Sequence, residues 1–135
     1  MGNCDFLREK EKENYKIAEY SEKRKYFDVA VSRYYYYLYQ SIIIYLESNF
    51  ENFQVPKGEN SHEYTIKFLG EQLFTLKILE YKECYRFSLL QKLRVSRRIS
   101  DYEYRKIANE FNYNQVFKNN FIMVEELLKK KLIIV

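Results

Sequence analysis

The chain has few of the residues that interrupt helices. Its 135 residues include 3 glycines, 1 proline and no tryptophan. Because glycine and proline are the strongest local breakers of regular structure, their scarcity favours long helices. The length corresponds to one domain, and a chain of this size buries about two-thirds of its unfolded surface on folding. We therefore expect residues 1–135 to form a single domain.

Cysteine is also scarce. Cys4 and Cys84 lie far apart in the sequence, without the density of a disulfide-stapled secreted domain or the spacing of a metal site. The strongly charged N-terminal segment lacks the apolar core of a secretory signal. The sequence therefore predicts a cytoplasmic protein that needs no metal and no other cofactor.

No apolar run is long enough to cross a bilayer. The longest, Tyr34–Leu46, is interrupted by Gln40 and Ser41 and is shorter than the roughly 20 residues that a membrane-spanning helix needs. Hydrophobic residues make up 47% of the chain and charged residues 31%, a combination that disordered and integral membrane proteins do not have. We expect no membrane association, and we place this run in the core or in a subunit interface.

The positive charge is concentrated in one segment. The chain has a net charge of +4, and residues 92–106 alone hold six cations and two carboxylates, which accounts for the whole surplus. Four of the six cations are arginines, whose planar fork suits phosphate better than the ammonium of lysine. The alternatives are a solvated basic helix face and an anion-binding surface. The cations are Lys92, Arg94, Arg97, Arg98, Arg105 and Lys106.

The spacing of apolar residues predicts two helices in the first part of the chain. The first is amphipathic and spans Phe6–Tyr20, and a short break follows at Ser21–Lys25. The second runs from about Lys25 to Ser48 and is apolar on nearly all sides, so other elements or a second subunit must cover it. Asn49–Asn60 contains the only proline and is the main loop between helices.

Three more helices are predicted in the second part. Ser61 is placed to cap a third helix over His62–Leu73. Phe74–Tyr81 alternates apolar and polar residues, so a short strand, an extended turn and a helix all stay open there. A fourth helix passes from Tyr85 through the basic segment to about Tyr104, and a last one spans Asn114–Leu132.

Three motifs, in order along the chain, resemble those of the HEPN superfamily of small all-helical domains. Ala30-Val31-Ser32-Arg33-Tyr34-Tyr35 is similar to the Ala-Val-Ser-Arg-x-Tyr-Tyr signature of the family's second helix. Ser61-His62 opens a helix after a Pro/Gly loop, similar to the family's histidine-containing third helix. The segment Leu93–Tyr104 resembles the family's Leu-x-x-x-Arg-x-x-x-Asp-Tyr segment and, in another branch, its Arg-x4-His-x-Tyr motif. The resemblance covers about residues 10–132.

The resemblance implies an all-α, four- to five-helix up-and-down bundle that dimerises through its helices and brings two basic motifs into one cleft. Active members of the superfamily are metal-independent ribonucleases, often toxins of toxin–antitoxin or defence systems, and others are partners of minimal nucleotidyltransferases. By this resemblance Arg97, Tyr102 and Tyr104 take the catalytic positions, and Tyr104 matches the tyrosine that a nucleotidyltransferase antitoxin modifies with AMP. The RNA or phosphate ligands implied are Arg94, Arg97, Arg98 and Arg105.

The chain departs from the motif at Tyr102, which stands where the family has its active-site histidine. Imidazole, with an ordinary pKa of about 6.5, suits proton transfer near neutral pH, whereas a tyrosine with a pKa of about 10 is only about a thousandth deprotonated at pH 7. The sequence therefore predicts an RNA- or nucleotide-binding homodimer whose ribonuclease activity is weakened or lost. The alternatives are a non-catalytic module that docks a minimal nucleotidyltransferase or another acidic protein, and a helical bundle with no nucleic-acid role.

Three further features have a structural interpretation beside a functional one. His62, the sole histidine, is the alternative catalytic base, but a turn or interface residue with one hydrogen bond explains its position better. Arg33 either bridges helices or lines the groove, and we favour the bridge. The tyrosines of Tyr34–Tyr37 are expected to pack in the core or an interface and not to stack on bases.

Overall fold

The computed structural model describes residues 2–51, 53–102, 107 and 109–133. Within these residues the chain is helical and contains no strand, which confirms the all-α class and the helical bundle. The long helices are α1 (Gly2–Lys23), α2 (Phe27–Asn49), α3 (Ser61–Thr75) and α4 (Cys84–Tyr102), and a composite helix follows them. None of the described helices is both long enough and apolar enough to span a membrane.

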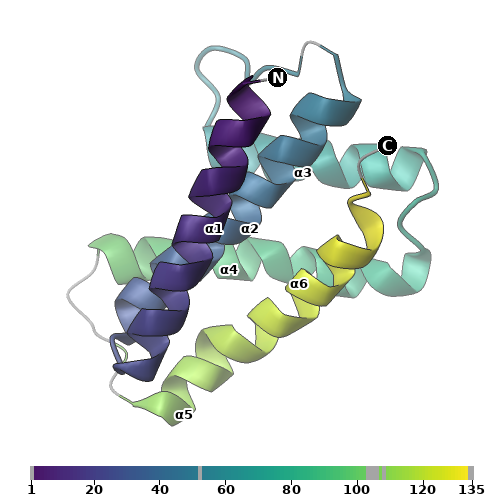
Figure 1. Ribbon diagram of the computed structural model, residues 1–135. Coiled ribbons are helices and arrows are strands. Elements are labelled where there is room, and N and C mark those ends of the chain that lie inside the picture. Colours follow the sequence, from purple (N-terminus) through teal and green to yellow (C-terminus); the bar gives the residue numbers. More distant parts are fainter. Residues whose placement is uncertain (1, 52, 103–106, 108, 134–135) are drawn as a thin grey trace.

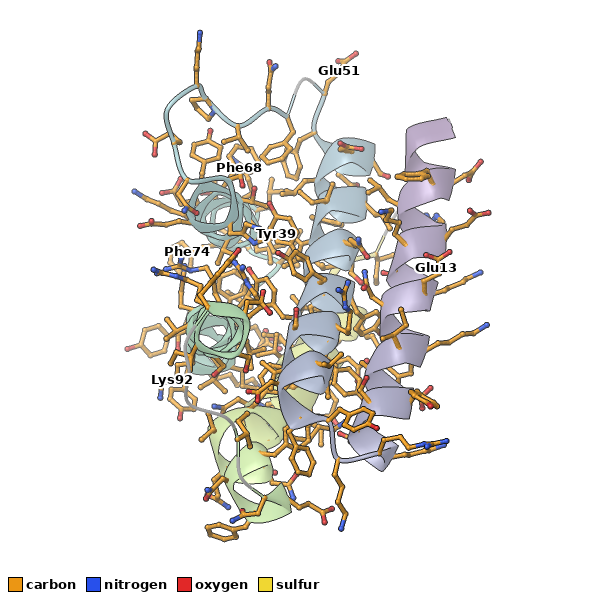
Figure 2. The ribbon with its side chains drawn as sticks, turned by 90° about the vertical axis from the view of Figure 1, so that its left-hand side faces the viewer. Glu13, Tyr39, Glu51, Phe68, Phe74 and Lys92 are labelled. Atoms are coloured by element: carbon orange, nitrogen blue, oxygen red, sulfur yellow. The ribbon has the colours of Figure 1, made fainter. Side chains whose placement is uncertain are left out.

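α2 is the central helix of the fold. Figure 1 shows α1 antiparallel to α2, while α3 and α4 form a second antiparallel pair that runs across the first. Figure 2 confirms the crossing, because α3 and α4 are seen nearly end-on beside the upright α1 and α2. Consecutive helices therefore reverse direction within each pair, and the two pairs cross one another.

The composition of α2 explains its central position. Its buried side chains cover most of the circumference of the helix, as the sequence predicts for a helix that other elements must cover, and Val29, Arg33 and Glu47 lie on its exposed side. Aromatic rings form much of this contact: Tyr34 lies 5.7 Å from Tyr15 of α1 and 4.5 Å from Phe121 of the last helix, measured between ring centroids. The buried residues of α2 are Phe27, Ala30, Val31, Ser32, Tyr34, Tyr35, Leu38, Ile42, Ile44, Tyr45 and Leu46.

The turn between α1 and α2 is tighter than the predicted break at Ser21–Lys25. α1 continues through Lys23, and Ser21 is buried inside it. The chain reverses over residues 24–26, where Lys25 has φ of 63° and the Tyr26 N–H donates to the Ser21 carbonyl at 2.8 Å. The predicted start of the break is therefore wrong, because a polar run at a helix end was taken for a loop.

Near α3 the structure corrects one prediction and decides a second point that the sequence left open. The N-cap is Asn60 and not Ser61: the Asn60 side chain accepts a hydrogen bond of 2.9 Å from the Glu63 N–H. Phe74–Tyr81 contains no strand; its first two residues end α3, Lys77 turns the chain with φ of 59°, and a short 3-10 helix, η1 (Tyr81–Glu83), leads into α4.

α3 and α4 approach one another closely at Gly70. A Cβ atom built on Gly70 would lie 2.8 Å from Cε1 of Phe87 in α4. Because any larger residue would push the ring away, the absence of a side chain at this position lets the second helix pair close.

The last helix is built from three joined parts. α5 (Glu110–Tyr113) is followed by a π-helical turn, η2 (Asn114–Lys118), and then by α6 (Asn119–Lys131). The prediction of a helix over Asn114–Leu132 is confirmed in its main part, although the helical structure begins four residues earlier.

Polar contacts tie this helix to the end of α1. The Lys118 ammonium lies 2.7 Å from the Glu22 carboxylate and 4.0 Å from the centroid of the Tyr34 ring. The Tyr113 hydroxyl donates to the same carboxylate at 2.7 Å. The π-helical turn therefore lies beside a half-buried ion pair that joins the first and last helices.

The cap assignment gives a direct test of local stability. Replacing Asn60 by alanine removes the acceptor of the Glu63 N–H, so we expect Asn60→Ala to lower the free energy of unfolding by about 1 kcal/mol. Urea denaturation followed by circular dichroism measures this change. Ser61→Ala is the matched control, and we expect it to shift stability by less than about 0.5 kcal/mol because it occupies the first helical turn. A larger loss from Ser61→Ala than from Asn60→Ala would reverse the assignment.

Candidate functional site: a tyrosine–arginine cluster between α2, α3 and α4

The basic residues predicted to bind RNA lie on α4, but they differ in exposure. Arg98 is exposed, and Arg94 is half-buried, its Nε donating to Oε1 of Gln91 at 2.9 Å. Arg97 is buried, with a relative exposure of 7%. Tyr102, at 77% exposure, projects into solvent at the end of α4. Tyr104 and Arg105 lie outside the described residues.

Arg97 is held by one carboxylate and two aromatic rings. Its Nη1 atom lies 3.5 Å from Oδ2 of Asp101, one helical turn further on, so these two residues share a face as their spacing predicts. The guanidinium carbon lies 5.4 Å from the ring centroid of Tyr35 and 5.5 Å from that of Tyr36, within the range of cation–π attraction. Its Nε atom is buried and has no hydrogen-bond partner. Arg97 therefore anchors α4 on α2 with part of its hydrogen-bonding capacity unused.

His62 joins the same group of side chains from α3. Its Nδ1 atom is hydrogen-bonded to the Tyr35 hydroxyl at 2.9 Å, and its ring stacks on Tyr39 with centroids 4.1 Å apart. Figure 2 shows Tyr39 on the side of α2 that faces α3. Three helices therefore meet in a tyrosine–arginine cluster, which consists of Tyr35, Tyr36, Tyr39, His62, Arg94 and Arg97.

The cluster keeps its histidine neutral. Burial lowers the pKa of His62 to about 4, and the positive charges of Arg97 and Arg94 act in the same direction. Burial also raises the pKa of the Tyr35 phenol, against the opposing effect of Arg97. At neutral pH the cluster therefore contains two cationic arginines beside uncharged rings.

This arrangement suits binding better than proton transfer. A catalytic base works best with a pKa near the operating pH, and an imidazole with a pKa of about 4 is a weak base at pH 7. Guanidinium groups beside aromatic faces, in contrast, bind phosphates and stack on planar rings. The prediction that His62 serves as an interface residue with one hydrogen bond agrees with its contact to Tyr35.

The sequence interpretation treated the tyrosine run as packing and did not connect it with Arg97 or His62. The packing is present, since Tyr34 and Tyr35 are buried, but Tyr35 also contacts both Arg97 and His62. The spacing of Tyr35 and Tyr39, four residues apart on one helix face, is the signal that could have predicted the pair. Arg33 donates to Oδ1 of Asn14 at 3.2 Å, and thus bridges α2 and α1 as favoured from the sequence.

Metal-binding groups do not gather in the described part of the chain. Its histidine, cysteine and carboxylate side chains form no group of three that could hold an ion. Cys84 at the start of α4 is a half-buried free thiol.

Comparison with known proteins adds no assignment: no protein-family model, no curated protein and no solved structure matches the chain. The function must therefore be inferred from the side chains described above.

The pKa of His62 is directly measurable because the chain has a single histidine. We expect its imidazole resonances to titrate with a midpoint near 4, and Arg97→Gln to raise this midpoint because it removes a neighbouring positive charge. Since the folded pKa lies below the unfolded value of about 6.5, the unfolded state binds the proton more tightly. Stability is thus retained above about pH 6.5 and lost as the pH falls toward 4, and His62→Gln should reduce this loss. A midpoint near 6.5 in the folded protein would contradict the burial of His62.

Proposed function

We propose that the chain is an RNA- or nucleotide-binding protein, acting as a homodimer through the arginines of α4, with ribonuclease activity that is weakened or lost. The observation that carries this proposal is the charge balance on the outer face of α4. Within the described residues, neither Arg94 nor Arg98 has a carboxylate at ion-pair distance. These two guanidinium groups are four residues apart and share a helix face.

Unpaired arginines favour an anionic ligand. A guanidinium that has no carboxylate partner keeps its donors for bidentate contacts to phosphate oxygens. Arg97 contributes to this surface indirectly, because its contacts with the rings of Tyr35 and Tyr36 fix α4 on α2 and so position the two outer arginines. The half-buried rings of Tyr36 and Tyr39 lie next to this charge, packed against Arg97 and His62 respectively.

The chemistry of the site supports binding more than cleavage. The position of the family's catalytic histidine holds Tyr102, and the only imidazole of the chain, His62, is neutral and engaged with Tyr35. A dimer would place two α4 helices against one nucleic-acid strand and double the number of phosphate contacts. The homodimer rests on the family resemblance and on the exposed surface of α4, where Val95 and Tyr102 lie near Arg98.

RNA affinity tests the role of the arginines. We expect Arg98→Ala to weaken binding of a fluorescent single-stranded RNA about tenfold and to reduce the slope of log K against log salt by about 0.7 for each phosphate contact removed. Fluorescence anisotropy at several salt concentrations measures both. Lys92→Ala is the matched control, since it removes the same charge from an exposed residue on a different face of α4, and it should change affinity less than about twofold. Binding that does not weaken with salt would reject phosphate contacts, and sedimentation velocity that finds only monomers would reject the dimer.

Cleavage is tested separately. With labelled single-stranded RNA in the presence of EDTA, we expect the wild-type chain to be inactive or slow and Tyr102→His to increase the cleavage rate, because it supplies an imidazole at the end of the arginine face. Tyr102→Phe is the control for loss of the phenol alone and should not gain activity. Rapid cleavage by the wild type, unchanged in Tyr102→Phe, would show that the activity is intact and lies elsewhere.

A further inference from the structure

A pocket lies on the face of α2 opposite the tyrosine–arginine cluster. It has a volume of about 290 Å³, is open to solvent on one side and is lined mainly by residues of α1, α2 and α6. In Figure 1 these helices lie in front of α3 and α4, with α1 and α6 diverging toward the C-terminal end of α6. The residues of α2 that line it, including Tyr37 and Ser41, are on a different side of the helix from Tyr35 and Tyr39. The pocket is therefore separate from the proposed RNA surface.

Two carboxylates reach this pocket from different helices. Glu11 of α1 accepts a hydrogen bond from the Ser41 hydroxyl, and Glu125 of α6 accepts one from the Tyr37 hydroxyl. Burial and the hydrogen bond with Glu125 raise the pKa of the Tyr37 phenol, so it stays protonated as the donor. The pocket thus has acidic groups whose positions are fixed by hydrogen bonds to α2.

Glu125 has acceptor capacity that the protein does not use. Its Oε2 atom is buried and has no hydrogen-bond partner; the nearest cation, the Lys129 ammonium, lies 3.6 Å away, beyond hydrogen-bond distance. Glu125 also lines the pocket, so the negative charge of its carboxylate is available to a cationic group of a ligand there.

Two cationic side chains, Arg8 and Lys129, also line this pocket. Arg8 lines it and, within the described residues, has no carboxylate at ion-pair distance. Lys129 is largely exposed, with its side chain at 67% relative exposure. A ligand that is only cationic would meet Arg8 and Lys129 unfavourably, and a ligand that is only anionic would meet Glu11 and Glu125 unfavourably. A zwitterion carries one group of each sign, so it complements both the two cations and the two carboxylates of the pocket.

The rest of the lining is apolar. Leu38, Ile44 and Leu128 contribute to the wall, together with Tyr45 and Leu132. A cavity of about 150 Å³ with an apolar lining holds a benzene ring, so about 290 Å³ accommodates a ring and a short polar chain. The ligand therefore needs an apolar group of this size beside its charged groups.

We propose that this pocket binds a free α-amino acid with an aromatic or large aliphatic side chain. The ammonium group of the ligand pairs with the carboxylate of Glu125, its carboxylate accepts from Arg8, and its side chain packs on the apolar wall formed by α2 and α6.

The experiment uses isothermal titration calorimetry on the full chain to compare three ligands that share a phenyl ring and a short carbon chain but differ in their charged groups. L-Phenylalanine has both charges, phenethylamine lacks the carboxylate, and 3-phenylpropanoate lacks the ammonium. We expect L-phenylalanine to bind at least about tenfold more tightly than either analogue, since each loses one ion pair at the pocket. Failure of all three to bind at millimolar concentration would overturn the proposal. Equal affinities of phenethylamine and L-phenylalanine would show that the ligand carboxylate contributes nothing, and would reject the proposal that the pocket recognises a zwitterion.

A variant pair locates the binding. Glu125→Gln removes the charge that faces the ammonium and should weaken L-phenylalanine about tenfold or more, whereas Glu126→Gln, an exposed neighbour outside the pocket, should leave the affinity unchanged. Circular dichroism confirms that both variants fold, and if Glu125→Gln does not, the comparison of the three probes on the wild type still decides. Unchanged affinity in folded Glu125→Gln would overturn the assignment of the ammonium site.

Discussion

The coverage of α2 by other helices is the constraint on which this structure depends. A helix that is apolar on nearly all sides is stable in water only if neighbours surround it, and here α1, the crossing α3–α4 pair and the last helix supply that cover. Because so many of its residues are tyrosines, the same helix also carries hydroxyl groups into the interior. Each hydroxyl that becomes buried needs a partner, and the partners found are a histidine for Tyr35 and a carboxylate for Tyr37. The polar features of the molecule follow from this need.

The two faces of α2 consequently have different chemical character. Toward α3 and α4 the tyrosines meet arginines and a neutral imidazole, which gives an electropositive surface. Toward α1 and α6 they meet carboxylates, with cations at the edge of a pocket. The tyrosines on one face of α2 therefore interact with positive charges, and those on the other face interact with negative charges.

Periodicity was enough to predict which segments are helical, because helix formation depends on the local pattern of apolar residues. It did not predict the ends of the helices correctly: Asn60 caps α3 in place of Ser61, and α1 extends through Lys23. The cap depends on which side chain accepts a hydrogen bond from a free N–H of the first turn, and periodicity does not report this. The burial of Arg97 was not predictable either. A run of cations on a helix looks solvated unless its partners are known, and Tyr35 and Tyr36 are some sixty residues away in the sequence. Long-range contacts of this kind arise only from the way the helices cross.

The π-helical turn at Asn114–Lys118 has the effect of one additional residue in an otherwise α-helical segment. Such an addition advances the helical phase by about 100°. Tyr113 before the turn packs against Phe27, and Phe121 after it packs against Tyr34, so the rings on both sides of the turn face α2. If one residue of this turn were removed, the two rings would be seven residues apart in a continuous α-helix, a spacing that keeps them on one face. The turn therefore accommodates an extra residue without moving either ring away from its aromatic partner on α2.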